Sequence, residues 1–137
     1  MTKIVLDTNV LLIALPSKSK YHLIIEYFNN RKYQLIITTS ILFEYEEILS
    51  KKTNNIVAYN IVNAFVEAPN AIPTNIYFNW NLISTDFDDN KFIDAALTAN
   101  ADYIVTNDTH FNEAKNNRFP NVNIISANDF LTILATL

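Results

Sequence analysis

Four acidic residues stand at the ends of apolar runs that are expected to be buried: Asp7, Glu44, Asp89 and Asp108. A fold that gathers the ends of these runs would also gather the carboxylates. Carboxylates that cluster where little water reaches them repel one another, and protons or a divalent cation must offset that repulsion. Because Mg²⁺ binds through oxygen ligands, the pattern predicts a magnesium-type site.

Strands and helices are expected to alternate along the chain. The expected strands are apolar throughout, which favours an α/β fold with a parallel sheet covered on both faces. We expect strands at 3–6, 35–37, 103–105 and 123–125. We expect helices over 17–29, from the 38–40 segment to about 49, from 54 or 55 to about 66, from the 86–89 segment to about 100, and from a cap at 126 or 128 onward.

Asp7 and Asp108 follow two of the expected strands. Asp7 comes directly after its strand and Asp108 comes three residues beyond its own. Ligand sites of open parallel sheets lie outside the carboxyl ends of the strands, which is where both residues are placed. The alternative is that either residue starts a turn or caps the following helix.

Asp89 can be placed on its helix by spacing alone. At about 100° per residue, it shares a direction with Phe92 and Ile93, so its carboxylate points with the core face, whereas Asp94 points away from it. In the alternative, Asp86 caps the helix and Asp89 is the acid of a capping-box arrangement.

Glu44 is not distinguished from its neighbour Glu46 by periodicity. Ile41, Tyr45 and Ile48 form an apolar stripe, and the two glutamates lie at its opposite edges. Either one is a candidate ligand, and a solvated position suits either equally well.

Composition sets limits on the function. A length of 137 residues predicts one domain spanning 1–137. We expect a cytoplasmic protein without a membrane partner, since no apolar stretch reaches the roughly 18 residues of a membrane span and no signal peptide is recognised. The absence of cysteine excludes thiolate nucleophiles and zinc–thiolate sites. The net charge of -4 argues against a protein that binds nucleic acid mainly through a basic surface. It does not exclude a nuclease, because cations held by carboxylates reverse the sign of the charge that a phosphate meets.

Glycine is absent from the chain, whereas asparagine is abundant. A P-loop and a dinucleotide-binding fingerprint are therefore excluded. Asparagine is the next most tolerant residue at positive φ, so we expect it at such positions, for instance at Asn29–Asn30 and Asn116–Asn117.

Four segments taken in order resemble the motifs of PIN-domain ribonucleases. The first is an apolar strand followed by Asp7-Thr8-Asn9, and the second is a polar helix cap followed by a glutamate, which selects Glu44. Residues 86–97 and 101–108 resemble the third and fourth motifs. The resemblance spans essentially the whole chain and is close to the branch of toxins in toxin–antitoxin pairs. Two places depart from this resemblance. Relatives commonly carry a glycine before the fourth motif, where this chain has Asn100–Ala101, and they often carry glycine or a basic residue where it has Asn107.

This resemblance implies a three-layer PIN fold with a central, mainly parallel sheet. It implies that Asp7, Glu44, Asp89 and Asp108 hold Mg²⁺ or Mn²⁺ and that the substrate is RNA. An antitoxin partner and a homodimer are also implied by the family.

A metal-activated water is the expected nucleophile in a chain without cysteine. Asp7 and Asp108 are expected as direct ligands, with Glu44 and Asp89 as ligands or as acceptors that orient water. Asn9, Ser40 and Thr106 are candidates to position a carboxylate or a water. The alternative is that these three residues are local caps and turn formers. His110 is expected to be a surface residue outside the catalytic set.

Two other functions compete with the nuclease. A haloacid-dehalogenase-type phosphatase also begins with a strand and an aspartate, but it needs a second acid where this chain has Asn9, and a Gly-Asp element that a glycine-free chain lacks. A catalytically silent PIN-like scaffold would bind RNA or a partner without cutting. The aromatic residues Tyr77, Phe78 and Trp80 are candidates to stack on bases, or to make core or oligomer contacts.

Overall fold

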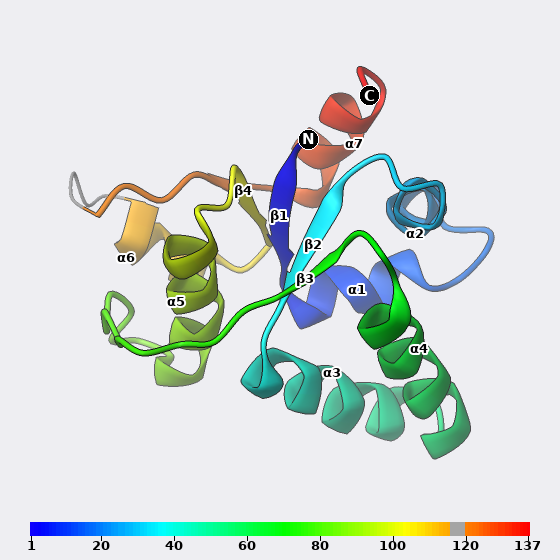
Figure 1. The fold of residues 1–137 in the computed structure, drawn as a ribbon, viewed down its shortest axis with the longest axis horizontal. Coiled ribbons are helices and arrows are strands. Elements are labelled where there is room, and N and C mark those ends of the chain that lie inside the picture. Colours follow the sequence, from blue (N-terminus) through cyan, green and yellow to red (C-terminus); the bar gives the residue numbers. More distant parts are fainter. Residues whose placement is uncertain (116–119) are drawn as a thin grey trace.

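The computed structural model describes residues 1–115 and 120–137, and within them a parallel sheet of five strands lies at the centre (Figure 1). The strand order is β3-β2-β1-β4-β5, and each neighbouring pair is parallel. The expected α/β fold with a central parallel sheet is therefore confirmed. The strands are β1 (Lys3–Leu6), β2 (Gln34–Ile37), β3 (Ala71–Pro73), β4 (Tyr103–Val105) and β5 (Ile124–Ile125).

Helices cover both faces of this sheet. The helix α5 packs against β1, β2 and β4 on one side, and α1, α2 and α4 lie on the other side (Figure 1). None of the helices in the described part of the chain combines the length and the apolar character needed to cross a bilayer. The helices are α1 (Thr8–Ala14), α2 (Leu23–Asn29), α3 (Thr39–Lys52), α4 (Asn55–Glu67), α5 (Asn90–Ala99), α6 (Asn112–Lys115) and α7 (Ala127–Leu134), with 3-10 turns η1 (Lys20–His22), η2 (Phe87–Asp89) and η3 (Thr109–Phe111).

Three helices begin at polar caps that the sequence offered. The side chains of Thr38, Asn54 and Ser126 accept hydrogen bonds from backbone N–H groups three residues further on, at 3.1, 2.9 and 3.1 Å. Each bond satisfies an N–H group that the first helical turn leaves without a partner. Thr38 fixes the start of α3, the helix that carries Glu44.

Left-handed backbone occurs at Arg31, Asn81 and Asn100 among the described residues, with φ of 59°, 53° and 57°. The expectation for Asn29–Asn30 is wrong, since Asn30 has φ of -87° and Arg31 takes the left-handed position instead. Asn116–Asn117 lie outside the described residues. Asn100 closes α5 in the left-handed conformation, which asparagine tolerates better than most residues other than glycine.

Several elements differ from the sequence-based expectation. Helix α1 begins directly after Asp7 and was not predicted, because its run of Val, Leu and Ile has no clear helical face. The predicted helix over 17–29 begins only at Leu23, after the turn η1. Strand β3 was missed because Pro73 lies in it, but β3 is at the edge of the sheet, where a missing N–H is tolerated. The short α6 was not predicted, and the aromatic stretch 76–82 forms no strand.

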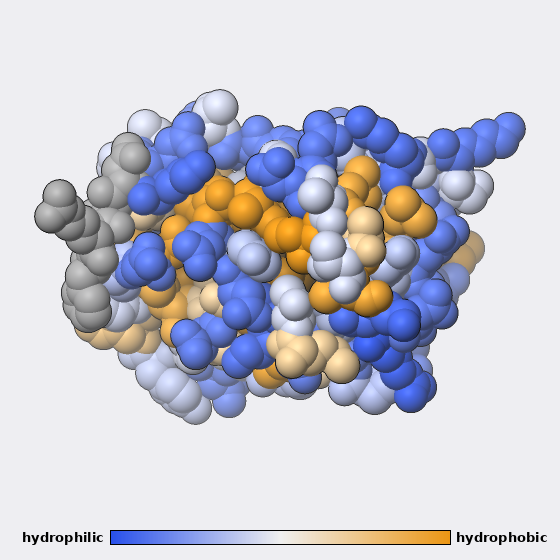
Figure 2. Space-filling model, turned by 90° about the horizontal axis from the view of Figure 1, so that it is seen from above, coloured by the Kyte–Doolittle hydropathy of each residue, from blue (hydrophilic) through white to orange (hydrophobic). Residues whose placement is uncertain are grey.

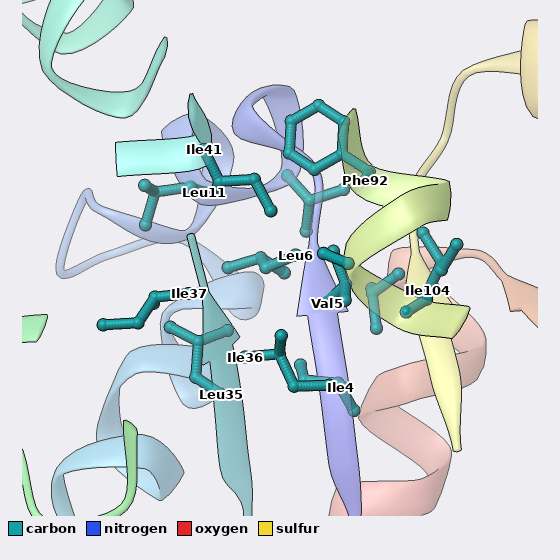
Figure 3. Close-up of a cluster of buried hydrophobic side chains, with 14 of the residues drawn as sticks. Ile4, Val5, Leu6, Leu11, Leu35, Ile36, Ile37, Ile41, Phe92 and Ile104 are labelled. Carbon is teal, nitrogen blue, oxygen red and sulfur yellow. The ribbon is translucent and has the colours of Figure 1, made fainter. Parts of the chain in front are cut away.

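Buried apolar side chains from the central strands and from α1, α3 and α5 form one core (Figure 3). This core holds the carboxyl ends of β1 and β4 next to the beginnings of α3 and α5. Figure 2 views the opposite end of the molecule, where β1 begins, and shows hydrophobic residues in its middle with hydrophilic ones around them. The acidic residues follow the strands at the other end.

Candidate active site

Asp7 and Asp108 lie at the same edge of the sheet because β1 and β4 are neighbours. Leu6 pairs with Val105, and the Asp7 N–H donates to the Val105 carbonyl at 3.0 Å. The Thr106 hydroxyl then donates to Asp7 Oδ2 at 2.7 Å and accepts from the Asp108 N–H at 3.0 Å. One buried hydroxyl thus connects the two aspartates that are most distant from each other in the sequence.

Glu44 reaches this edge from α3. The Tyr45 hydroxyl donates to the Leu6 carbonyl at 2.5 Å and holds α3 over the end of β1. Both carboxylate oxygens of Glu44 have partners: Thr8 Oγ1 donates to Oε2, and Lys91 Nζ donates to Oε1 at 2.8 Å. Glu46 is exposed. The tertiary structure therefore distinguishes the two glutamates that spacing left equal.

Asp89 stands at the junction of η2 and α5 and is only 9% exposed. Its side chain makes no capping hydrogen bond, and its Oδ2 atom has no hydrogen-bond partner within the described residues. Asp86 caps η2, as that alternative expected, accepting from the Asp88 N–H at 3.3 Å. The Asp86 cap of the alternative is therefore confirmed, but Asp89 makes no capping hydrogen bond within the described residues, and its buried Oδ2 atom is left without a donor.

The four carboxylates interact through their charges. Burial raises the pKa of Asp7 to about 6; the hydrogen bond from Thr106 lowers it, and the charges of Glu44 and Asp108 raise it further. Burial also raises the pKa of Asp89 to about 7, with further contributions from Asp86, Asp108, Asp7 and Glu44. A positive charge placed among these groups would relieve both the repulsion and the loss of hydration.

The chemistry of this donor set fits a divalent cation. The four carboxylates come from the ends of β1 and β4, from α3 and from the start of α5, and Asp89 Oδ2 lacks any donor among the described residues. Hard cations such as Mg²⁺ bind oxygen ligands of this kind. The arrangement could hold a cation and, through it, a phosphate group.

The remaining predicted residues occupy different positions. Thr106 contacts Asp7, as described above. Asn9 and Ser40 are exposed, and neither makes a hydrogen bond with the four carboxylates in the part of the chain that is described. Asp94 was expected to point away from the core face, yet it is buried, because it accepts from the Trp80 N–H at 2.9 Å and the 76–83 segment lies on α5 there.

Three residues near the site were not expected from the sequence. Thr8 and Lys91 contact Glu44. His110 lies with its Nδ1 atom 3.3 Å from Asp108 Oδ1 and 3.9 Å from both Asp86 Oδ2 and Asp89 Oδ2. Thr8 and His110 could have been found from their positions next to Asp7 and Asp108, whereas Lys91 has no local signal because its partner is 47 residues away.

Solved structures with the same fold include two protein–DNA complexes. VapBC from Salmonella typhimurium bound to DNA matches with a TM-score of 0.61 and 18% identity, covering 93% of this chain and 99% of that chain. VapBC2 from Rickettsia felis, bound to a DNA fragment from its promoter, matches with a TM-score of 0.60 and 16% identity, covering 91% of this chain and 98% of that chain. The RRP44 PIN domain of T. brucei matches with a TM-score of 0.58 and 16% identity, covering 98% of this chain and 82% of that chain.

Family assignment comes from the sequence itself. No curated protein sequence matches the chain. A family model described as the PIN domain matches residues 3–110, which include the four acidic positions and the strands and helices that carry them. The chain therefore belongs to the PIN domain family.

Proposed function

We propose that the chain is a metal-dependent endoribonuclease in which Asp7, Glu44, Asp89 and Asp108 form the catalytic cation site. The observation that carries this proposal is the gathering of the four carboxylates at one edge of the sheet, where the charges of Glu44 and Asp108 raise the pKa of Asp7 and those of Asp108, Asp7 and Glu44 contribute to the raised pKa of Asp89. The cation is Mg²⁺ or Mn²⁺, and the substrate is RNA.

The side chains of the proposed site have different roles. When bound, the cation supplies an acidified water and neutralises charge on the attacked phosphodiester. Thr106 holds Asp7 through Oδ2, which leaves Oδ1 for the cation. Thr8 and Lys91 occupy both oxygens of Glu44, so we assign to Glu44 the role of orienting water. Asn9 and Ser40 are exposed and are proposed to contact substrate or water at the rim.

The biological setting is also part of the proposal. Two of the structural neighbours are VapBC complexes bound to DNA, and the sequence motifs resemble the toxin branch, which supports an antitoxin protein as partner. We propose that residues 1–137 act as a single domain in the cytoplasm, as a homodimer when free. The net charge of -4 makes RNA binding depend on the cation site more than on a basic surface.

Cleavage of a fluorogenic single-stranded RNA panel tests the function. We expect cleavage with Mn²⁺ or Mg²⁺, none with EDTA, and a loss of at least about a hundredfold in Asp7→Asn, because the cation loses a ligand. Asp88→Asn is the matched control, since Asp88 is an exposed neighbour of Asp89 and lies outside the proposed site. Cleavage that persists in EDTA or in Asp7→Asn would overturn the mechanism.

The scaffold function gives a different result in the same experiment. A silent PIN-like protein would bind the RNA panel without cutting it under either metal. A haloacid-dehalogenase-type phosphatase would hydrolyse p-nitrophenyl phosphate and leave RNA intact, but membership of the PIN domain family and the Asn9 side chain count against it.

A further inference from the structure

Three potential ligands converge beside the four carboxylates from two separate turns. Asp86 and Asp89 flank η2, and His110 belongs to η3. Asp86, Asp89 and His110 each offer one ligand atom, and these atoms all lie within 4.8 Å of one another. The His110 backbone N–H donates to Asp108 Oδ1 at 2.9 Å, which caps the start of η3.

The spacing of these atoms is unlike that of hydrogen-bonded partners. His110 Nδ1 is 3.9 Å from Asp86 Oδ2 and from Asp89 Oδ2, beyond the range of a hydrogen bond. Two ligands about 2.1 Å from one ion are about 3.4 Å apart at a tetrahedral angle, so a small inward movement would let a cation bridge the three.

The burial of one of these three atoms points to the same place. The Asp89 Oδ2 atom is both the oxygen that faces His110 and the buried atom without a donor among the described residues. Asp89 is only 9% exposed, so water does not readily satisfy this atom. A cation between Asp89 and His110 would satisfy it.

We propose that Asp86, Asp89 and His110 bind a transition-metal cation of the Zn²⁺ type, at a position distinct from that of the proposed catalytic cation. An imidazole nitrogen is a good ligand for such ions and a poor one for Mg²⁺, so the site discriminates between them. The inference rests on the proposed function only in that both sites use Asp89. His110 Nδ1 lies closer to Asp108 Oδ1, at 3.3 Å, than to the carboxylates of Asp86 and Asp89.

Nitrogen NMR of the histidine rings tests the site directly, with Zn²⁺ as the probe. The chain contains two histidines, and His22 Nδ1 already lies 2.8 Å from the Ala14 carbonyl, so it serves as the internal reference. We expect one equivalent of Zn²⁺ to move the Nδ1 resonance of His110 to that of a metal-bound nitrogen and to leave His22 unchanged. Mg²⁺ should leave both unchanged. Zn²⁺ binding without a change at His110 Nδ1 would overturn the proposal.

Calorimetric titration of Zn²⁺ into variants gives a second readout that does not depend on activity. Asp86→Asn should weaken binding at this site by about tenfold or more, whereas the exposed neighbour in Asp88→Asn should have no effect. Equal affinities in the two variants would refute the assignment of Asp86.

The Asp7→Asn variant separates this inference from the proposed function. Asp7 belongs to the proposed catalytic site and not to the group of three. Coordination of Zn²⁺ by His110 in Asp7→Asn supports the separate position, even if the protein fails to cleave RNA. Loss of that coordination would show that the two positions are one and would contradict the proposal.

Discussion

At the scale of single residues, the partners of the carboxylates matter as much as the carboxylates themselves. Thr106 holds Asp7, and Thr8 and Lys91 hold Glu44. The Lys91–Glu44 pair is mostly buried, with side chains that are 23% and 21% exposed. The ammonium group of Lys91 therefore offsets one negative charge of the cluster while no cation is bound, and it competes with a cation for Glu44.

Lys91→Met should therefore tighten the binding of Mn²⁺. Removal of a positive charge close to the proposed site reduces the repulsion of the cation and frees Glu44 Oε1. At an intermediate effective dielectric constant, the substitution should lower the dissociation constant for Mn²⁺ about tenfold. Isothermal titration calorimetry measures this constant.

Lys51→Met is the matched control because Lys51 pairs with Glu47 on α3 at 3.5 Å, with side chains that are 68% and 64% exposed. Exposed pairs of this kind contribute little, so the Mn²⁺ affinity should stay unchanged. Weaker Mn²⁺ binding in Lys91→Met would contradict the prediction, because Lys91 would then be needed to hold Glu44 in place.

Residues in the site differ in how far sequence could predict their positions. Asp7 and Asp108 were placed correctly at one edge because each follows a strand, and parallel strands end on the same side. Glu44 could not be separated from Glu46 by spacing, since the tertiary bond from Tyr45 to the Leu6 carbonyl decides which glutamate faces the strand ends. The contact of Lys91 with Glu44 depends on how α3 and α5 pack, and no local pattern encodes that.

At the scale of elements, apolar runs and polar caps predicted most strands and helix starts, and the errors have physical causes. Helix α1 is a run of apolar residues that a strand would also tolerate, and only its position directly after β1 makes it helical. Strand β3 contains Pro73, which reads as a breaker unless the strand is known to lie at the sheet edge.

The turn after α2 offers a stability prediction for a chain without glycine. Arg31 has φ of 59°, and its N–H donates to the Phe28 carbonyl at 2.9 Å, so the left-handed conformation is built into the end of this helix. A left-handed residue with a Cβ atom costs roughly 1–2 kcal/mol. After allowing for the greater freedom of glycine in the unfolded chain, Arg31→Gly should raise the free energy of unfolding by about 1 kcal/mol.

Urea unfolding of Arg31→Gly beside Lys32→Gly measures this effect. Lys32 is also exposed but lies outside the left-handed region, so glycine there should lower stability by about 0.5–1 kcal/mol. Changes of opposite sign in the free energy of unfolding at these adjacent positions identify the backbone conformation as the cause. Equal losses in both variants would contradict the explanation.

At the scale of the whole molecule, the cluster of carboxylates makes the metal-free fold less stable than its core alone would allow. The folded protein holds Asp7 and Asp89 with raised pKa values of about 6 and about 7, whereas the same groups in the unfolded chain titrate near 3.8. Between about pH 4 and pH 7 the folded state therefore binds more protons than the unfolded state. Stability must fall as the pH rises through this interval.

In EDTA, the free energy of unfolding from urea titrations should thus be lower at pH 8 than at pH 5. Asp7 alone accounts for about 3 kcal/mol over the interval from 3.8 to about 6. Glu113 does not contribute to this change between pH 5 and pH 8, because hydrogen bonds from Thr85 and Ser84 lower its pKa to about 2. Asp7→Asn should flatten the pH dependence and raise stability at pH 8, and Mn²⁺ should stabilise the wild-type protein more than this variant. A wild-type protein whose metal-free stability increases from pH 5 to pH 8 would contradict the crowding of charge on which the proposed cation site depends.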